Sequence, residues 1–269
     1  MKIAFQTLAT PNWSWTHTLS EAKRMGYDGI ELRGIDGEMY LPKAQPFLPE
    51  NIEQTLIDIE RSGLEICCLD ASSSFHDPDK VSQAIQEGKD YIDLAVQLKV
   101  PYIRVFGDLL PQTDSRTEVV KRISGALTEL GQYAEGKQVT VLLETHGDIN
   151  NYQIVQEILT GAASSALGLL WDFGHPYFNK EDPEVTYREL APYIKHTHVK
   201  DAKILPLGHE LCLIGEGDVP VAEMIHILKR NHYDGWLSLE FEKKWYPDLL
   251  DEPEVSLPAY MAYVKGVLA

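Results

Sequence analysis

The chain has few cysteines and no long apolar run. Three cysteines among 269 residues are too few for a disulfide framework. Cys67 and Cys68 are adjacent in an apolar run, so strand alternation places them on opposite faces, and we expect buried thiols. No apolar run reaches the ~18 residues of a membrane span, and the first residues lack the pattern of a secretory signal. We therefore expect a cytoplasmic protein with no membrane partner.

Basic residues are also scarce. The chain has 24 Lys and Arg against 41 Asp and Glu, which gives a net charge of −17. Nucleic-acid phosphates are contacted mainly by Lys and Arg, so we expect no nucleic-acid partner. The acidity itself is best explained by solubility, and it does not indicate a fold. A homo-oligomer is compatible with the sequence, since symmetric dimers are the commonest assembly.

Short apolar runs alternate with amphipathic segments along the whole chain. One segment carries Ile52, Leu56 and Ile59 at helical spacing and ends at Gly63. Strand, helix, strand repeated eight times predicts parallel strands joined by right-handed crossovers. We expect a single (β/α)8 TIM barrel domain of the α/β class over residues 1–269, with a doubly wound open sheet as the second choice. The predicted strands are 2–7, 29–33, 64–69, 101–106, 139–144, 167–172, 194–199 and 236–241.

Two segments are expected to be long loops, and other features mark helix starts. Residues 34–48 and 203–219 read as irregular and are long enough to cover a pocket. Pro-Glu at 49–50 and Asp-Pro-Glu at 182–184 are good helix starts, with acidic residues at the positive end of the helix dipole. Asp218 is well placed as the N-cap of the helix that follows it.

Four predicted strands end in a carboxylate or an imidazole: Glu144, Asp172, His198 and Glu240. The active sites of TIM barrels lie at the carboxyl ends of the strands, where these side chains would meet. Together they would repel one another unless a divalent cation lay between them. Oxygen ligands with one imidazole suit Mn²⁺, Mg²⁺ or Co²⁺, with Zn²⁺ possible. Glu31, which also lies at a strand end, is by itself more simply structural.

Five segments occur in an order that resembles a known superfamily. They are Leu-Glu-Thr-His at 143–146, Trp-Asp-Phe-Gly-His at 171–175, His-Thr-His-Val-Lys-Asp at 196–201, Ile-Gly-Glu-Gly-Asp at 214–218 and Leu-Glu-Phe-Glu-Lys-Lys-Trp at 239–245. This set resembles the xylose-isomerase-like TIM barrels, which comprise sugar isomerases and epimerases and also endonuclease IV and inosose dehydratase. The acidity of the chain disfavours endonuclease IV, which needs a basic DNA face and more histidines.

The resemblance implies roles for the residues at the strand ends. In the ketose 3-epimerase branch the same four residues bind a divalent metal, and the two glutamates, Glu144 and Glu240, act as catalytic acid and base. The resemblance also implies that His175 contacts the substrate. An arginine that many epimerases carry beyond the metal-binding histidine is absent here, so Lys200 or His209 is the candidate replacement. His146 and Arg104 are further candidates for binding substrate hydroxyls.

The expected function is therefore a metal-dependent isomerase or epimerase of a keto-sugar or a sugar derivative. The reaction would move a proton through an enediolate. The alternative is a dehydratase, a lyase that acts on a keto-polyol of the inosose type with His146 or Lys200 as the general acid. A third class is a sugar-binding barrel without catalysis. The sequence does not identify the sugar, its phosphorylation, the metal or the oligomeric state.

Overall fold

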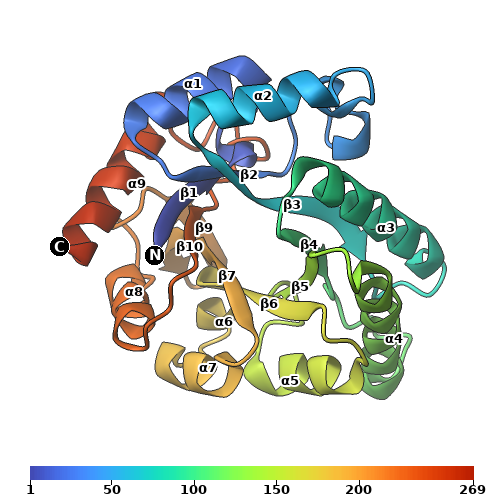
Figure 1. Cartoon of the computed structure of the whole chain (residues 1–269). Coiled ribbons are helices and arrows are strands. Elements are labelled where there is room, and N and C mark those ends of the chain that lie inside the picture. The colour runs from blue at the N-terminus through green and yellow to red at the C-terminus, as the bar shows by residue number, and fades with distance from the viewer. The chain divides into compact units, whose positions relative to one another are not determined.

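The computed structural model describes all residues from Met1 to Ala269. Eight parallel strands form a closed barrel in the order β1-β10-β7-β6-β5-β4-β3-β2, and helices connect them (Figure 1). The fold class is therefore an α/β TIM barrel, as the sequence predicted. The strands are β1 Lys2–Gln6, β2 Gly29–Leu32, β3 Glu65–Ser74, β4 Tyr102–Phe106, β5 Thr140–Glu144, β6 Leu167–Asp172, β7 Ile194–Val199 and β10 Trp236–Leu239.

The chain forms two compact units, which are described separately below. Unit 1 comprises residues 1–67 and 196–269, and unit 2 comprises residues 68–195. Each unit contains four of the parallel strands, and β3 and β7 cross the unit boundaries. That residues 1–269 behave as one domain stays a prediction.

Unit 1 contains the ladder β2-β1-β10-β7. Ala4 of β1 pairs with Gly29 of β2 and with Ser238 of β10, and Ser238 in turn pairs with His198 of β7. The register therefore places residues that are far apart in sequence on one sheet. Its helices are η1 Thr7–Ala9, α1 Trp15–Met25, η2 Leu41–Lys43, η3 Gln45–Phe47, α2 Ile52–Ser62, α8 Val221–Arg230 and α9 Pro253–Leu268. In Figure 1, α1 lies beside α2, and α8 lies beside α9.

Local sequence explains where these helices begin and end. The Ser14 side chain accepts a hydrogen bond from the His17 amide and caps α1, and Gly26 ends α1 with a positive φ of 81°. Gly63 ends α2 in the same way, as predicted. The start predicted at residues 49–50 was wrong by two residues, because residues 48–51 form a turn, in which the Asn51 amide donates to the Leu48 carbonyl, and α2 begins at Ile52.

Unit 2 contains the ladder β3-β4-β5-β6, in which Glu144 of β5 lies opposite Leu170 of β6. Its helices are α3 Val81–Leu98, α4 Arg116–Ala134, α5 Tyr152–Gly161, α6 Gly174–Phe178 and α7 Pro183–Leu190. Ser115 and Glu118 form a capping box at the start of α4. Asp182 caps α7 just before Pro183, so the helix start predicted at 182–184 is confirmed. In Figure 1, α3, α4 and α5 follow one another along this unit.

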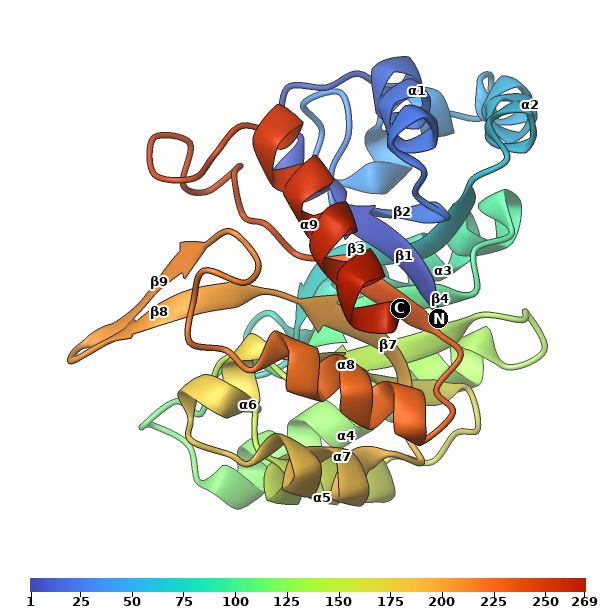
Figure 2. The same cartoon turned by 90° about the vertical axis from the view of Figure 1, so that its left-hand side faces the viewer.

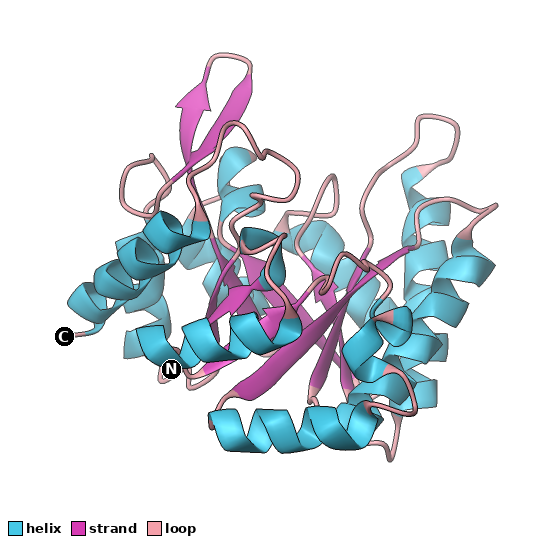
Figure 3. Cartoon of the chain, turned by 90° about the horizontal axis from the view of Figure 1, so that it is seen from above, coloured by secondary structure: helices cyan, strands magenta, loops and turns pink.

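A two-stranded antiparallel hairpin follows β7 in unit 1. Its strands are β8 Asp201–Leu205 and β9 Gly208–Cys212, and it projects as an arm in Figures 2 and 3. The prediction of an irregular loop over 203–219 was therefore wrong for residues 203–212, which belong to the hairpin. The second half of that segment is tied down by Asp201, whose carboxylate accepts from the amides of Gly215, Gly217 and Val219.

The side chain of Asp218 does not cap α8, as the sequence had suggested. It accepts instead from the amide of Ile204 in the hairpin at 2.7 Å, and Pro220 precedes the first turn of α8.

The thiols of Cys67 and Cys68 are buried, as expected, and neither forms a disulfide. None of the helices combines the length and the apolar character needed to cross a membrane.

Candidate active site

The four residues predicted as metal ligands all lie at the ends of parallel strands. Glu144 and Asp172 are the last residues of β5 and β6 in unit 2. In unit 1, His198 is the penultimate residue of β7 and Glu240 follows β10 directly. The Glu240 amide donates to the Val199 carbonyl at 3.0 Å and so extends the ladder by one residue. All four side chains are buried.

In unit 1, Glu240 lies among cationic and imidazole groups. Its Oε1 atom is 3.5 Å from His198 Nδ1 and accepts from Gln6 Nε2 at 3.4 Å. Its Oε2 atom forms an ion pair with Lys200, whose Nζ atom is also 3.5 Å from Glu242. Burial alone would raise the pKa of Glu240, but the charge of the adjacent Lys200 ammonium outweighs it and holds the pKa well below 4.5. Glu240 is therefore a carboxylate.

The spacing of His198 and Glu240 fits two ligands of one ion. Two atoms bound at about 2.1 Å to the same tetrahedral or octahedral ion lie roughly 3.0 to 3.4 Å apart. The observed separation of 3.5 Å between His198 Nδ1 and Glu240 Oε1 is close to that range. A nitrogen and a carboxylate oxygen are also the donor types that divalent transition metals accept.

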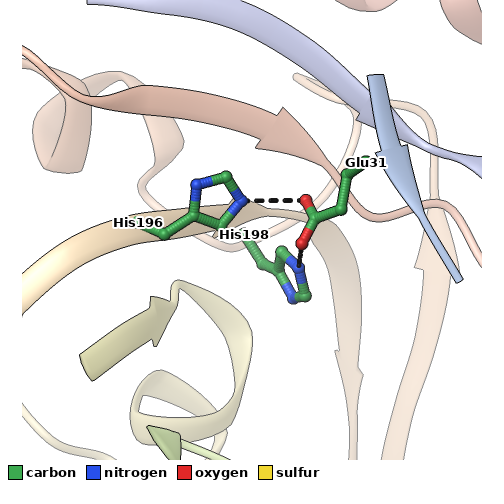
Figure 4. Close-up of side chains that lie close together, drawn as sticks. All are labelled: Glu31, His196 and His198. Atoms are coloured by element: carbon green, nitrogen blue, oxygen red, sulfur yellow. Dashed lines mark hydrogen bonds and ion pairs between the residues drawn. The ribbon is translucent and has the colours of Figure 1, made fainter. Parts of the chain in front are cut away.

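Glu31 organises this region, although sequence reasoning treated it as structural. The side chain is fully buried on β2, and its two oxygens bind His196 Nε2 at 2.9 Å and His198 Nε2 at 3.0 Å (Figure 4). Ser238 donates a third hydrogen bond to the same carboxylate. The available signal was a charged residue within the buried strand Gly-Ile-Glu-Leu.

In unit 2, Glu144 faces a buried arginine. Arg104 Nε is 3.1 Å from Glu144 Oε2, and Arg104 Nη2 is 3.4 Å from Asp70 Oδ2. The guanidinium also lies over the Phe106 ring at 3.9 Å and donates to the Ala71 carbonyl. The single positive charge of Arg104 thus lies beside two buried carboxylates. That Arg104 also binds a substrate hydroxyl stays a prediction.

Asp172 is held by the turn that follows β6. Its Oδ1 atom accepts from the amides of Gly174 at 2.8 Å and His175 at 2.9 Å, at the start of the short helix α6. Its own amide donates to Thr145 Oγ1 at 2.9 Å. These contacts fix the carboxylate at the end of the strand, which is what a preorganised ligand requires.

The structure brings His146 and His175 together in unit 2. Their ring centroids are 4.4 Å apart, and His146 also contacts Phe106. Asp108, which sequence reasoning missed, has its Oδ1 atom 3.2 Å from His146 Nδ1. The hydrogen bond from His146 is the main reason that the pKa of Asp108 is lowered. The backbone of Asp108 has a positive φ of 71°, which marks a strained position at this site.

His209 belongs to strand β9 of the hairpin, whose residues are mostly exposed. With Glu242, Tyr246 and Leu250 it lines a pocket of about 130 Å³ in unit 1. Burial and the charge of Lys200 lower the pKa of His209. Of the two candidates to replace the missing arginine, Lys200 is therefore the one that contacts Glu240.

Each unit carries buried side chains of the types that bind divalent metals. Unit 1 supplies an imidazole and a carboxylate, and unit 2 supplies two buried carboxylates. Oxygen ligands with one imidazole do not discriminate among Mn²⁺, Mg²⁺, Co²⁺ and Zn²⁺. A divalent ion is therefore chemically compatible, and its identity is not fixed by these residues.

Comparisons with known proteins agree with this description. Inosose isomerase from Halalkalibacterium halodurans is 24% identical over 273 residues, covering 95% of this chain and 93% of the relative. Inosose dehydratase from Clostridium tetani is 28% identical over 141 residues, covering 46% of this chain and 47% of the relative. These similar proteins are an isomerase and a dehydratase, so the comparisons support an enzyme without choosing between the two reactions.

Solved structures match the fold. The crystal structure of the IOLI protein with a bound zinc atom has a TM-score of 0.84 at 21% identity, covering 100% of this chain and 98% of that chain. D-psicose 3-epimerase with D-tagatose from Clostridium cellulolyticum has a TM-score of 0.76 at 15% identity, covering 100% and 97%. The family model for xylose isomerase-like TIM barrels matches residues 19–259. This chain therefore belongs to the family of xylose isomerase-like TIM barrels.

Proposed function

We propose that this protein is a divalent-metal-dependent isomerase or epimerase of a keto-sugar derivative, with a keto-inositol as the leading substrate class. The observation that carries the proposal is Glu240, a buried carboxylate at a strand end that Lys200 keeps ionised beside His198. A base must be ionised and held in place before it can remove a proton from carbon. Similarity to an inosose isomerase over nearly the whole chain supports this substrate class.

The proposed metal ligands are Glu144, Asp172, His198 and Glu240. Their support is the fold, because the carboxyl ends of barrel strands form one active-site face, and their burial, because buried carboxylates need a compensating charge. When bound, the ion supplies positive charge beside the substrate oxygens where negative charge develops. The zinc atom in the IOLI structure supports the choice of a divalent ion.

Proton transfer is assigned to the two glutamates. Glu240 takes the proton from the carbon next to the substrate carbonyl, which leaves an enediolate. Glu144 lies on β5 rather than after β10, so we assign it to the opposite side of that carbon. Glu144 takes up a proton from solvent and delivers it to the other face, which gives an epimer, while Glu240 releases its own proton to solvent. If Glu240 instead delivers its proton to the neighbouring carbon, after the hydroxyl proton has moved between the two enediolate oxygens, the product is an isomer. Arg104 Nε, 3.1 Å from Glu144 Oε2, holds that carboxylate in position.

The remaining predicted residues bind hydroxyl groups in this proposal. Lys200 donates from the ion pair with Glu240, and His146 and His175 present adjacent imidazoles from unit 2. Each of these groups donates a hydrogen bond, as a polyhydroxylated substrate requires.

A dehydratase is the second candidate, and the Asp108–His146 pair favours it. Loss of water from the same enediolate needs an acid that protonates the departing hydroxyl. His146, oriented by a carboxylate 3.2 Å from its Nδ1 atom, has the arrangement of such an acid. Similarity to inosose dehydratases over about half of the chain also supports this reading.

The test is a substrate screen in deuterated water. Keto-inositols, ketohexoses and hydroxypyruvate are incubated with the protein and with Mn²⁺, Mg²⁺, Co²⁺ or Zn²⁺ in turn, and followed by proton NMR and mass spectrometry. An isomerase or epimerase incorporates deuterium at carbon, and apart from this label its product has the same mass as the substrate. A dehydratase forms a product that is lighter by one water. If the protein neither exchanges deuterium into any keto-sugar nor converts one, whichever metal is added, the proposal is wrong.

We propose that the protein acts in the cytoplasm on a small molecule. The buried thiols Cys67 and Cys68, which form no disulfide, favour a reducing compartment such as the cytosol. The net charge of −17 favours a small-molecule substrate over a nucleic acid. A homo-oligomer remains part of the proposal, because symmetric dimers are the commonest assembly.

A further inference from the structure

Glu31 is a fully buried carboxylate with three hydrogen-bond donors. Its Oε1 atom binds His198 Nε2 at 3.0 Å and its Oε2 atom binds His196 Nε2 at 2.9 Å (Figure 4). The Oε2 atom also accepts a hydrogen bond from the Ser238 hydroxyl. The three donors come from β7 and β10, whereas Glu31 belongs to β2. In the ladder of unit 1, β1 and β10 lie between β2 and β7. The side chain therefore reaches across the sheet to the two imidazoles.

Burying the carboxylate of Glu31 is unfavourable, so the groups that compensate it indicate what the side chain does. Removing a carboxylate from water without partners is unfavourable, and proteins compensate it with hydrogen bonds or opposite charge. Each oxygen of Glu31 lies within hydrogen-bond distance of one imidazole Nε2 atom, and Oε2 also accepts from the Ser238 hydroxyl. Glu31 is thus an acceptor at both oxygens, and each imidazole must place its proton on Nε2.

The proton position decides which histidine atom is left for an ion. With Nε2 donating to Glu31, the Nδ1 atom of neutral His198 carries the lone pair. That atom is the one that faces Glu240 Oε1 at 3.5 Å. Because each oxygen of Glu31 binds a different ring, the carboxylate cannot turn without breaking both bonds. His196 therefore holds Glu31 in place while Glu31 holds His198.

We propose that Glu31 is a positioning residue that fixes His198 with Nε2 protonated and Nδ1 presented as a metal ligand. This inference rests on the metal site proposed above. A carboxylate that accepts from the far nitrogen of a ligating histidine orients the ring and raises its basicity, and removing it typically weakens metal binding about 10- to 100-fold.

Replacement of Glu31 by glutamine tests the proposal because it changes one functional group. The amide offers a single acceptor oxygen, and two of the three donors, His196 and Ser238, converge on Oε2. We expect the oxygen to stay on that side, so that the NH₂ group faces His198. His198 must then accept at Nε2 and carry its proton on Nδ1, which removes the ligand atom.

The measurement is the affinity for Co²⁺, followed through its visible absorption in the full-length protein without substrate. Glu31→Gln should bind Co²⁺ about 10- to 100-fold more weakly than the unchanged protein. Ser238→Ala removes a hydrogen bond to the same carboxylate but leaves both imidazole bonds, so it should lower stability and leave the affinity unchanged. Glu65→Gln, at an exposed glutamate that pairs with Lys2, is the surface control.

The outcomes separate this inference from the proposed function. If the unchanged protein binds no Co²⁺, the proposed metal site fails and takes the role of Glu31 with it. If the unchanged protein binds Co²⁺ and folded Glu31→Gln binds equally well, only the role of Glu31 is overturned. A Ser238→Ala variant that loses affinity as strongly as Glu31→Gln would also overturn it, because a general loss of packing would then explain both.

A second measurement needs no change at Glu31. Nitrogen-15 NMR of the histidine rings reports which nitrogen is protonated, and the His198 signals are assigned by their loss in His198→Asn. At neutral pH in the metal-free protein, His198 should show a protonated Nε2 and a bare Nδ1. The opposite tautomer would contradict the proposal even if Glu31→Gln did not fold.

Discussion

Replacing Glu240 by glutamine is the most informative change in the chain. Glutamine preserves the size of the side chain and one acceptor oxygen, but it removes the charge that pairs with Lys200 and faces His198 at 3.5 Å. Loss of a general base alone lowers a rate by about 10² to 10⁴-fold, so we expect at least ~100-fold slower exchange of substrate hydrogen with deuterium. The loss is not additive with removal of Glu144, because the same side chains serve as ligand and base.

The stability cost of Glu240→Gln should be modest. Lys200 keeps Glu242 at 3.5 Å, so its charge retains one partner. We expect a loss of about 1 to 3 kcal/mol, the usual cost of weakening a buried polar contact. Thermal unfolding followed by circular dichroism will show whether the variant is folded at the assay temperature.

Glu242→Gln is the matched control for this experiment. It removes the same type of charge from the same lysine, two residues further along, and Glu242 is more exposed than Glu240. We expect Glu242→Gln to retain most of the exchange rate. The reasoning is refuted if folded Glu240→Gln exchanges within about tenfold of the unchanged protein, because a base supplies more than that, or if both variants lose the same activity.

Three further predictions concern the surroundings of the site. The hydrogen bond from His146 lowers the pKa of Asp108 below 3.8, so its stabilising contribution is complete above that pH and is lost as the pH falls through the lowered value. Urea unfolding should therefore show a weaker acid dependence in Asp108→Asn than in the unchanged protein. Gly147 has a φ of +57°, and a Cβ there would lie 2.6 Å from the Asp108 carbonyl, so Gly147→Ala should lose about 1 to 3 kcal/mol in the same assay. Burial raises the pKa of Cys212 to about 11, so Ellman's reagent at pH 8 should find no fast thiol in the native protein and three after denaturation.

The sequence was sufficient to predict the barrel strands and the residues at their ends. Buried parallel strands are short apolar runs, and this local signal located β6 and β7 to the residue. A charged residue that ends such a run stands out, which is how Asp172 and His198 were found. The placement of Glu144 and Glu240 followed from the same pattern.

Features that depend on distant contacts were not visible in the sequence. The role of Glu31 requires β2 to share a ladder with β7, whose histidines are 165 and 167 positions away. A single glutamate gives no local sign of such partners. The hairpin of β8 and β9 was missed because most of its residues are exposed on both faces, so it lacks the apolar alternation that marks a half-buried strand. Asp108 was missed because its backbone, in a loop, adopts a conformation that propensities do not predict.

Anomalous X-ray scattering from crystals grown with Mn²⁺ tests the central claim most directly, because it locates the ion without assuming its ligands. We predict one strong peak bound by the carboxylates of Glu144, Asp172 and Glu240 and by the Nδ1 atom of His198. Anomalous peaks confined to surface carboxylates, or none at a Mn²⁺ concentration that supports turnover, would contradict the account.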